Sequence, residues 1–166
     1  MHLIQKLIAD YGLIGIPNTG KSTLLNTLTA SKAETANYAF TTLEPNLGVY
    51  EKMVIADIPG LIEGASAGKG LGIRFLKHIE KVKLLIHCIS AESKDVVKDF
   101  ETVMNELSAY NEVVAKKDMI VLLTKIDLVS EKEVKEKLKE LKKLSDKVYP
   151  ISVVDPKSIE ALKKLL

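Results

Sequence analysis

The sequence predicts a three-layer α/β fold, in which helices cover both faces of a mostly parallel β-sheet of six strands. Short apolar segments alternate with segments of helical periodicity along the whole chain of 166 residues. The motifs that carry chemically active side chains each follow a predicted strand, and parallel sheets bind their ligands at that end of the strands. One antiparallel strand is expected at the edge of the sheet.

The first half of the chain predicts a strand, a helix, a loop and a hairpin. Residues 7–14 are apolar and short enough for a buried strand, and residues 23–30 carry leucines at helical spacing. Residues 31–42 lack apolar periodicity and are expected to form a loop. Strands at residues 47–51 and 52–57 leave only Glu51 and Lys52 for the turn between them, which is unusual because neither is glycine or asparagine.

The second half continues the alternation of strand and helix. Residues 64–72 are rich in glycine and are expected to form a mobile loop. Strands are predicted at residues 83–90, 119–124 and 148–153. Helices are predicted at residues 71–82 and 94–111, around Val134, Leu138 and Leu141, and around Ile159, Leu162 and Leu165.

Composition predicts one soluble domain without a membrane partner. Hydrophobic residues make up 46% of the chain and charged residues 28%, and no apolar run reaches membrane-spanning length. Neither a signal peptide, an internal repeat nor a linker is recognisable, so we expect a cytoplasmic monomer of one domain, residues 1–166. Cys88 is the only cysteine and lies in a predicted buried strand, which favours core packing over catalysis. A net charge of +2 with a single arginine, Arg74, does not indicate a nucleic-acid partner.

The most specific motif is Gly15-Ile16-Pro17-Asn18-Thr19-Gly20-Lys21-Ser22, which fits the phosphate-binding loop (P-loop) pattern G-x-x-x-x-G-K-[ST] between a strand and a helix. The glycines let backbone N–H groups converge on phosphate oxygens, and the N-terminus of the following helix, from Thr23, adds partial positive charge. Lys21 is expected to reach the outer phosphates, and the Ser22 hydroxyl to bind Mg²⁺. The chain is therefore expected to bind a nucleoside polyphosphate.

A second motif, Asp57-Ile58-Pro59-Gly60, ends the predicted hairpin. Asp57 is expected to hold Mg²⁺ through its water shell, and the backbone N–H of Gly60 to contact the γ-phosphate. Taken alone, this pattern also fits an ordinary turn.

Two further motifs predict a base-binding site. In Thr124-Lys125-Ile126-Asp127, the Asp127 carboxylate can accept N–H bonds from guanine, and Lys125 would lie against the base and ribose. An aspartate after a strand also fits simple helix capping. In Ser152-Val153-Val154, a backbone N–H is positioned to meet the guanine O6.

The assembled motifs resemble the G domain of the Obg (CgtA) family of GTPases. The resemblance covers essentially all 166 residues. It is most specific in three stretches: Gly12-Leu13-Ile14-Gly15-Ile16-Pro17-Asn18-Thr19-Gly20-Lys21-Ser22-Thr23, Phe40-Thr41-Thr42-Leu43-Glu44-Pro45-Asn46-Leu47-Gly48, and Ala56-Asp57-Ile58-Pro59-Gly60-Leu61-Ile62-Glu63-Gly64-Ala65. The resemblance implies a Ras-like P-loop fold, binding of GTP and GDP, slow hydrolysis of GTP, and association with the large ribosomal subunit during assembly or stress control.

The resemblance also implies roles for individual residues. Phe40, Thr41 and Thr42 match the first switch segment, in which Thr42 would complete the Mg²⁺ ligands with Ser22 and Asp57. Lys21, Thr42 and Gly60 would act in catalysis. Leu61 stands where Ras-like enzymes carry a water-orienting glutamine, and switch I has no arginine, so unaided turnover is expected to be slow. Asn18 matches a position that helps to hold K⁺ in some relatives, which makes stimulation by K⁺ a hypothesis. Equal rates of GTP hydrolysis in Na⁺ and K⁺ would contradict it.

The chain departs from the family pattern in three ways. The N-terminal glycine-rich domain and the C-terminal extension of full Obg proteins are absent, so the sequence is expected to be a G domain alone. The hairpin of residues 47–57 is shorter than the family's, and Thr124 replaces the commoner asparagine, which is expected to weaken nucleotide affinity without changing base choice.

Three readings of the sequence remain open. The chain is a GTPase switch with slow turnover, or a nucleotide-gated binding module whose own hydrolysis is negligible. Single-turnover hydrolysis with and without Thr42→Ala separates these two. The third is an ATPase like the YchF family, against which Asp127 argues because YchF proteins lack the guanine-selecting motif.

Overall fold

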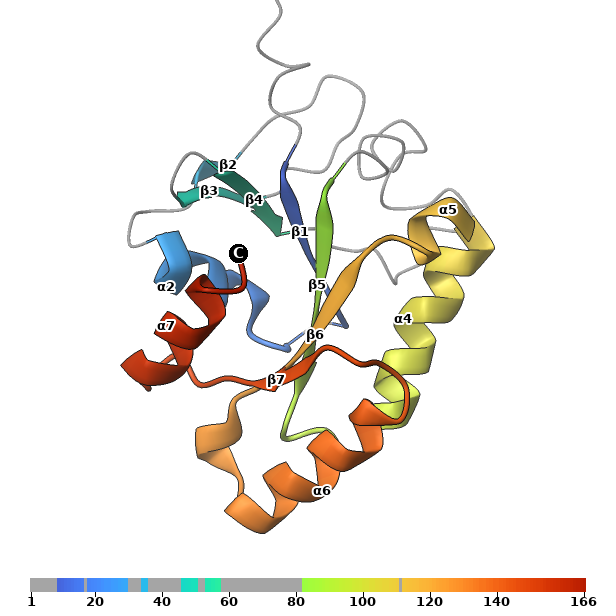
Figure 1. Cartoon of the computed structure of the whole chain (residues 1–166), viewed down its shortest axis with the longest axis vertical. Helices are drawn as coiled ribbons and strands as arrows, with labels where there is room; N and C mark the ends of the chain where they lie inside the picture. The colour runs from blue at the N-terminus through green and yellow to red at the C-terminus, as the bar shows by residue number, and fades with distance from the viewer. Residues whose placement is uncertain are drawn as a thin grey trace, which may run out of the picture.

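A mostly parallel β-sheet organises the part of the chain that the computed structural model describes, which is residues 9–16, 18–29, 34–35, 46–50, 53–57, 82–110 and 112–166. Within these ranges the sheet has seven strands in the order β2-β3-β4-β1-β5-β6-β7 (Figure 1). The strands are β1 (Tyr11–Ile14), β2 (Glu34–Thr35), β3 (Asn46–Tyr50), β4 (Met53–Asp57), β5 (Leu84–Ser90), β6 (Met119–Thr124) and β7 (Val148–Pro150).

The helices of the described part follow the strands in the chain. They are α2 (Lys21–Thr29), α4 (Val96–Tyr110), α5 (Glu112–Ala115), α6 (Glu131–Lys142) and α7 (Pro156–Lys163), with a short 3₁₀ turn, η2 (Ile126–Leu128). Capping residues set several of these boundaries. The backbone N–H of Lys98 donates to Asp95 before α4, and Ser130 and Asp155 are the N-caps of α6 and α7. None of these helices is both long enough and apolar enough to cross a bilayer.

The pairing of the strands confirms the predicted fold class. Strand β1 runs parallel to β4 and β5, β5 to β6, and β6 to β7, whereas β3 is antiparallel to β4. The predicted six strands are all present. The structure adds β2, two residues inside the segment 31–42 that was expected to be a loop, and it pairs antiparallel with β3. The antiparallel hairpin strand β3 is therefore second from the edge.

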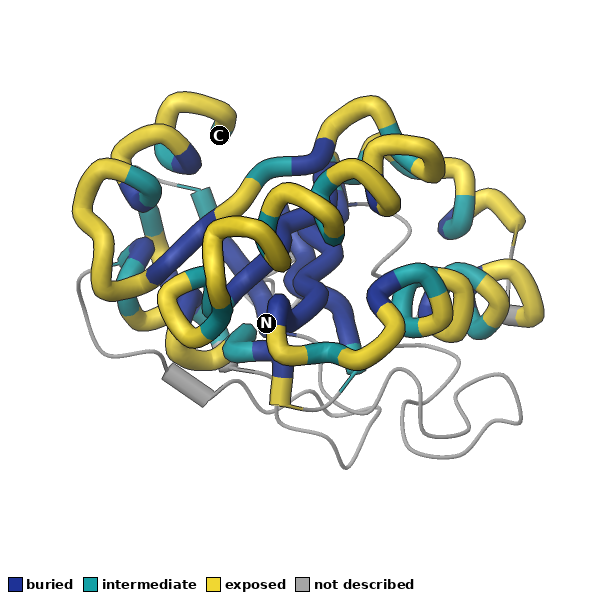
Figure 2. Tube along the Cα trace, turned by 90° about the horizontal axis from the view of Figure 1, so that it is seen from below, coloured by how far each residue is buried: buried dark blue, intermediate teal, exposed yellow. Residues whose placement is uncertain are grey.

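Helices cover both faces of the sheet (Figure 1). Helices α2 and α7 pack on one face and α4 and α6 on the other, and the strands form a buried band between them (Figure 2). The first face has a core that includes Leu13, Leu24, Leu25, Ile86, Leu122, Ile159 and Leu162. The second includes Ile89, Val96, Val121, Leu123 and Leu141. Alternating residues of each strand thus serve the two layers.

Some predicted boundaries differ from the structure. The last strand ends at Pro150 rather than at residue 153. One further bond to the sheet follows, from the Ile151 N–H to the Leu123 carbonyl at 2.9 Å, and the chain then turns away toward α7. The predicted helix of 94–111 spans Val96–Tyr110, and α5 follows as a separate turn. The hairpin tip, the glycine-rich loop of 64–72 and nearly all of the predicted helix of 71–82 lie outside the described residues.

Gly48 fixes the distance between the hairpin and α2, and this generates a stability prediction. A β-carbon at Gly48 would lie 2.4 Å from Thr29 Cγ2 and 3.0 Å from Leu25 Cδ1. We expect Gly48→Ala to lower the free energy of unfolding by about 1–3 kcal/mol, the usual cost of overpacking, when measured by denaturant titration.

The matched control is Thr29→Ser. This change removes the clashing methyl group and keeps the hydroxyl that donates to the Leu25 carbonyl at 2.9 Å. The double variant should recover most of the loss. Simple additivity of the two single changes would contradict the predicted contact.

Candidate functional site

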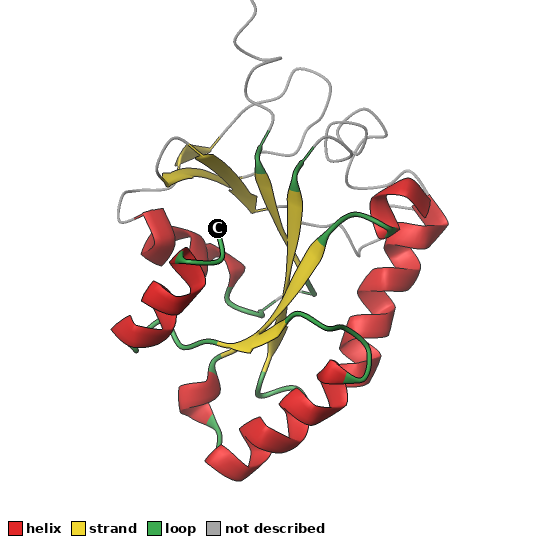
Figure 3. Ribbon diagram, viewed as in Figure 1, coloured by secondary structure: helices red, strands yellow, loops and turns green. Residues whose placement is uncertain are grey.

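The predicted site residues that the structure describes gather at the carboxyl edge of the sheet. Because β1, β4, β5, β6 and β7 run in the same direction, the segments that follow them leave the same edge (Figure 3). Gly15 follows β1, Asp57 ends β4, Lys125 follows β6 and Ser152 comes soon after β7. The topology therefore brings together motifs that lie far apart in the sequence.

The P-loop curls around the ammonium group of Lys21. Lys21 Nζ donates to the carbonyl oxygens of Gly15 at 3.2 Å and Ile16 at 3.4 Å. Gly20 has a φ of +87° and Gly15 a φ of +154°, and a β-carbon on Gly15 would lie 2.5 Å from the Cys88 carbonyl oxygen. Both glycines are therefore required by backbone conformation or close approach, and α2 begins directly after them, at Lys21.

Two side chains that follow or end β6 fasten the P-loop to the rest of the site. The buried Thr124 hydroxyl donates to the Thr19 carbonyl at 2.7 Å and lies 3.3 Å from the Ile89 carbonyl. Lys125, whose φ is +59°, donates from Nζ to the Asn18 carbonyl at 2.8 Å. Lys125 Nζ also lies 3.6 Å from a carboxylate oxygen of Glu92, a partner that the sequence motifs do not reveal. The two predicted motifs thus form one structure.

Ser22 and Asp57 form an oxygen-rich pair beside the P-loop. The Ser22 hydroxyl donates to Asp57 Oδ2 at 2.7 Å. Asp57 is 5% exposed, and its Oδ1 is buried without a hydrogen-bond partner among the described residues. A buried carboxylate oxygen next to a hydroxyl is a donor set that suits a hard divalent cation such as Mg²⁺. No cluster of three or more acidic, histidine or cysteine side chains that could hold a metal exists in the described ranges, so Ser22 and Asp57 would supply only part of the coordination.

A cavity of about 210 Å³ adjoins the P-loop and contains Asp127 in its wall. Its lining residues are Gly20, Thr23, Leu24, Thr124, Lys125, Asp127, Leu128, Ile151 and Val153. The Ser152 hydroxyl donates to Asp127 Oδ1 at 2.8 Å, which fixes one carboxylate oxygen and leaves Oδ2 without a hydrogen-bond partner in the described part of the chain. The backbone N–H of Val153 likewise has no acceptor among the residues described. The cavity therefore offers both a carboxylate acceptor and a backbone donor.

Two buried side chains of β5 lie behind the site and stay uncharged near neutral pH. Burial, with a smaller effect of the Lys21 charge, lowers the pKa of His87 to about 3, and its ring stacks on Phe100 with the centroids 5.3 Å apart. Burial raises the pKa of the Cys88 thiol to about 12. Cys88 is therefore a core residue and not a nucleophile, as the sequence predicts.

Several predicted site residues lie outside the described residues, namely Pro17, Phe40, Thr41, Thr42, Ile58, Pro59, Gly60 and Leu61. Sequence reasoning also missed two hydroxyl groups. It assigned only a backbone N–H to the segment 152–154, and it gave no role to Ser158, which contacts Ser152. Serine before or within a helix start is common, so no sequence signal separated these two from ordinary capping residues.

Comparison with known proteins gives a family match over most of the chain. Residues 10–125 match the sequence model of the family described as 50S ribosome-binding GTPase. GTPase Obg of Rickettsia felis is 49% identical over 170 aligned residues, which cover 99% of this chain and 52% of the relative. GTPase Obg of Rickettsia prowazekii is 48% identical over 170 residues, covering 99% of this chain and 51% of the relative. The chain thus spans about half the length of the curated relatives it matches.

Solved structures with the same fold include a GDP-bound protein and a G domain. A mutant of S. thermophilus NFeoB bound to GDP has a TM-score of 0.69 at 16% identity, covering 94% of this chain and 60% of that one. The G domain of the T. maritima FeoB iron transporter has a TM-score of 0.64 at 25% identity, covering 94% of both chains. The P-loop architecture is confirmed by these likenesses, and the resemblance to Obg by the curated relatives. The chain belongs to the 50S ribosome-binding GTPase family, and within it matches the G domain of the Obg proteins.

Proposed function

We propose that this chain is a guanine-nucleotide switch that binds GTP and GDP and hydrolyses GTP slowly to GDP and phosphate. The observation that carries the proposal is the Asp127 carboxylate, held at one oxygen by Ser152 in a cavity that adjoins the P-loop. Family membership supports the same activity. The large ribosomal subunit as partner belongs to the proposal, supported by the family description alone, and a cytoplasmic location is proposed because that partner is found there.

The P-loop supplies the binding site for the phosphates. Lys21 Nζ is held by two carbonyl oxygens and can turn to phosphate oxygens without breaking an ion pair, since none is formed by Lys21 within the described residues. The N-terminus of α2 adds N–H donors and partial positive charge. Ser22 is the second residue of α2, where its hydroxyl can face the phosphates and Asp57 together.

The base cavity supports selection of guanine. Guanine presents N1–H and an exocyclic amine on one edge, and Asp127 can accept both, whereas adenine offers no such pair. The backbone N–H of Val153, which has no acceptor among the described residues, is suited to the guanine O6, and the Lys125 side chain lines the cavity wall where the base would lie. These contacts also count against the ATPase alternative.

Ser22 and Asp57 are the described residues that would hold Mg²⁺, with Thr42 expected as a further ligand. Bound Mg²⁺ would neutralise charge on the β- and γ-phosphate oxygens. Asp57 Oδ1 has no hydrogen-bond partner among the described residues, which supports this assignment, because a buried carboxylate oxygen without a partner costs stability unless a ligand compensates it.

Hydrolysis would proceed by in-line attack of water on the γ-phosphate. Lys21 and the P-loop N–H groups would stabilise the charge that develops on the phosphate oxygens. Thr42 and Gly60 are expected to contact the γ-phosphate, and Leu61 supplies no group that could orient the water. An absent arginine finger alone costs roughly 10³–10⁵ in rate, so turnover by this chain should be slow.

A nucleotide-gated binding module with negligible hydrolysis is the second candidate. The same residues bind the nucleotide in both cases, so the difference lies in turnover alone. Single-turnover hydrolysis by the unchanged chain and by Thr42→Ala separates them: a chemical step that Thr42→Ala abolishes favours the GTPase, and no measurable step in either favours the module.

Asp127 generates the first functional prediction. In a titration with fluorescent GDP, unlabelled GDP and GTP should displace the probe and ATP should not. Asp127→Asn should weaken GDP binding and shift preference toward xanthosine diphosphate, because an amide N–H can pair with the xanthine 2-oxo group. Lys21→Ala is the control that should abolish binding of every nucleotide. Displacement by ATP, or normal GDP affinity in Asp127→Asn, would contradict guanine selection by Asp127.

The hydroxyl of Ser22 generates a prediction about Mg²⁺. Wild-type affinity for GTP should rise on addition of Mg²⁺, and Ser22→Ala should lose most of that rise because a metal ligand is missing. Thr27→Ala is a matched control, since it deletes a hydroxyl of the same helix that donates to the Thr23 carbonyl at 2.8 Å and has no other partner in the described part of the chain. An equal Mg²⁺ effect in Ser22→Ala and Thr27→Ala would remove Ser22 from the metal site.

Asn18 generates a prediction about K⁺. Its φ of +67° places it in a left-handed turn of the P-loop, with an exposed side chain beside the phosphate site. GTP hydrolysis should be faster in K⁺ than in Na⁺, and Asn18→Gly, which tolerates this φ, should remove the difference. Equal wild-type rates in the two salts would eliminate K⁺ as a cofactor.

A further inference from the structure

We propose that Ser158, in the first turn of α7, is a positioning residue for guanine recognition, acting on Asp127 through Ser152. The hydroxyl of Ser158 fixes the backbone of Ser152, and the hydroxyl of Ser152 fixes the Asp127 carboxylate. This inference rests on the proposed guanine site and adds a residue that does not touch the nucleotide.

Ser158 contacts both backbone polar groups of Ser152. Ser158 Oγ accepts from the Ser152 backbone N–H at 3.0 Å and lies 2.8 Å from the Ser152 carbonyl oxygen. It also lies 3.0 Å from the Asp155 carbonyl oxygen, so its single proton is shared between two acceptors. A hydroxyl that accepts from one residue's N–H and donates to the same residue's carbonyl restrains both ends of that residue.

Ser152 has particular need of this restraint because the sheet no longer supports it. The last sheet bond of this segment is Ile151 N–H to the Leu123 carbonyl at 2.9 Å. Ser152 is 2% exposed, and a buried backbone N–H without a partner would destabilise the fold. The Ser158 hydroxyl therefore accepts the hydrogen bond from the Ser152 N–H that the carbonyl of a neighbouring strand would otherwise accept.

Two hydrogen bonds orient the side chain of Ser152. Its hydroxyl donates to Asp127 Oδ1 at 2.8 Å and accepts from the Val154 N–H at 3.3 Å. Asp127 itself is exposed, so solvent does little to orient its carboxylate. Turning Ser152 would turn the plane of that carboxylate, and with it the direction in which Oδ2 accepts a ligand proton.

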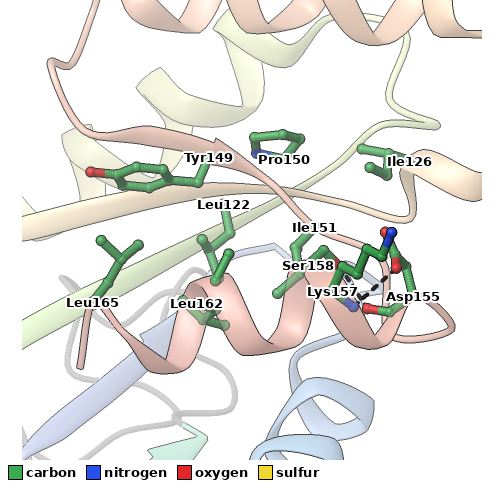
Figure 4. A pocket seen from close by; sticks show the side chains of 11 residues that line it. Leu122, Ile126, Tyr149, Pro150, Ile151, Asp155, Lys157, Ser158, Leu162 and Leu165 are labelled. Atoms are coloured by element: carbon green, nitrogen blue, oxygen red, sulfur yellow. Dashed lines mark hydrogen bonds between the residues drawn. The ribbon is translucent and has the colours of Figure 1, made fainter.

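Helix α7 gives Ser158 a rigid support. Pro156 occupies the first turn, and Asp155 caps it by accepting from the Lys157 N–H at 3.0 Å. Ile159 and Leu162 anchor the helix in the core. Figure 4 shows Ser158 between Asp155 and Ile151, at the polar end of an apolar groove that also contains Tyr149, Leu162 and Leu165.

The experiment measures base discrimination rather than stability alone. The dissociation constants of GDP and inosine diphosphate, which lacks the exocyclic amine, are compared for wild type, Ser158→Ala, Ser158→Thr and Ser152→Ala. Asp127 would accept two N–H bonds from the guanine of GDP and one from inosine diphosphate, and a pair of bonds depends more on the orientation of the carboxylate than a single bond does. Ser158→Ala should therefore weaken GDP about three- to tenfold, the range of one hydrogen bond, and inosine diphosphate less. Ser158→Thr keeps the hydroxyl and should restore the preference for GDP.

Ser145→Ala is the matched control, because the Ser145 hydroxyl also accepts from a nearby backbone N–H, that of Lys147 at 3.3 Å, but at the opposite end of β7. It should leave the ratio of the two dissociation constants unchanged. The double variant Ser158→Ala with Ser152→Ala should discriminate no worse than Ser152→Ala alone, since Ser158 acts through Ser152.

Two outcomes would overturn the inference while leaving the proposed function intact. One is a lower melting temperature of Ser158→Ala with an unchanged ratio of GDP to inosine diphosphate affinity, which is what a purely structural role predicts. The other is additive losses in the double variant. Wild-type protein that binds GDP no better than ADP would overturn the proposed guanine site and this inference with it.

Discussion

The hydrogen bond from the Thr124 hydroxyl to the Thr19 carbonyl is the contact on which the rest of the site depends. It joins residues 105 positions apart, at a length of 2.7 Å, and it is buried. Lys125 adds a second link, to the Asn18 carbonyl. The links are needed because the P-loop follows β1 and Thr124 ends β6, and β5 lies between these two strands in the sheet. With them, the P-loop and the wall of the base cavity are joined directly by two hydrogen bonds.

Because residue 124 is threonine, its side chain makes one strong hydrogen bond rather than two. A hydroxyl has one proton, and Thr124 has two carbonyl acceptors within reach, at 2.7 Å and 3.3 Å, so only the shorter contact is a full hydrogen bond. An amide at the same place would offer two N–H groups, one for each carbonyl. The expectation that Thr124 weakens nucleotide affinity thus has a structural reason, and Asp127, the residue proposed to select the base, is unchanged by it.

Sequence patterns predicted what depends on local chemistry and on the alternation of elements. The P-loop, Asp57 and the motif ending in Asp127 could be found because their residue types follow strands, and parallel strands bring their carboxyl ends together. Strand β2 could not be predicted, since two residues carry no periodicity and their pairing with β3 is set by tertiary contact. The end of β7 was placed too late because 148–153 is apolar enough for a longer strand, whereas the turn depends on Ser158 in the next helix. A contact between two side chains that lie far apart in the chain produces no local pattern in the sequence, so it could not be predicted.

Three charged groups of the site share one arrangement, in which a neutral partner holds each group without neutralising it, whereas Lys125 lies 3.6 Å from a carboxylate oxygen of Glu92. Lys21 is held by two carbonyl oxygens, Asp57 by the Ser22 hydroxyl and Asp127 by the Ser152 hydroxyl. Each carboxylate keeps one oxygen without a partner among the described residues. Ion pairs would orient these side chains equally well, but they would cancel the charge that a phosphate, a cation or a guanine edge must meet. Hydrogen bonds from neutral partners instead orient each side chain and leave its charge in place. A site for an anionic ligand and its counter-ion requires both.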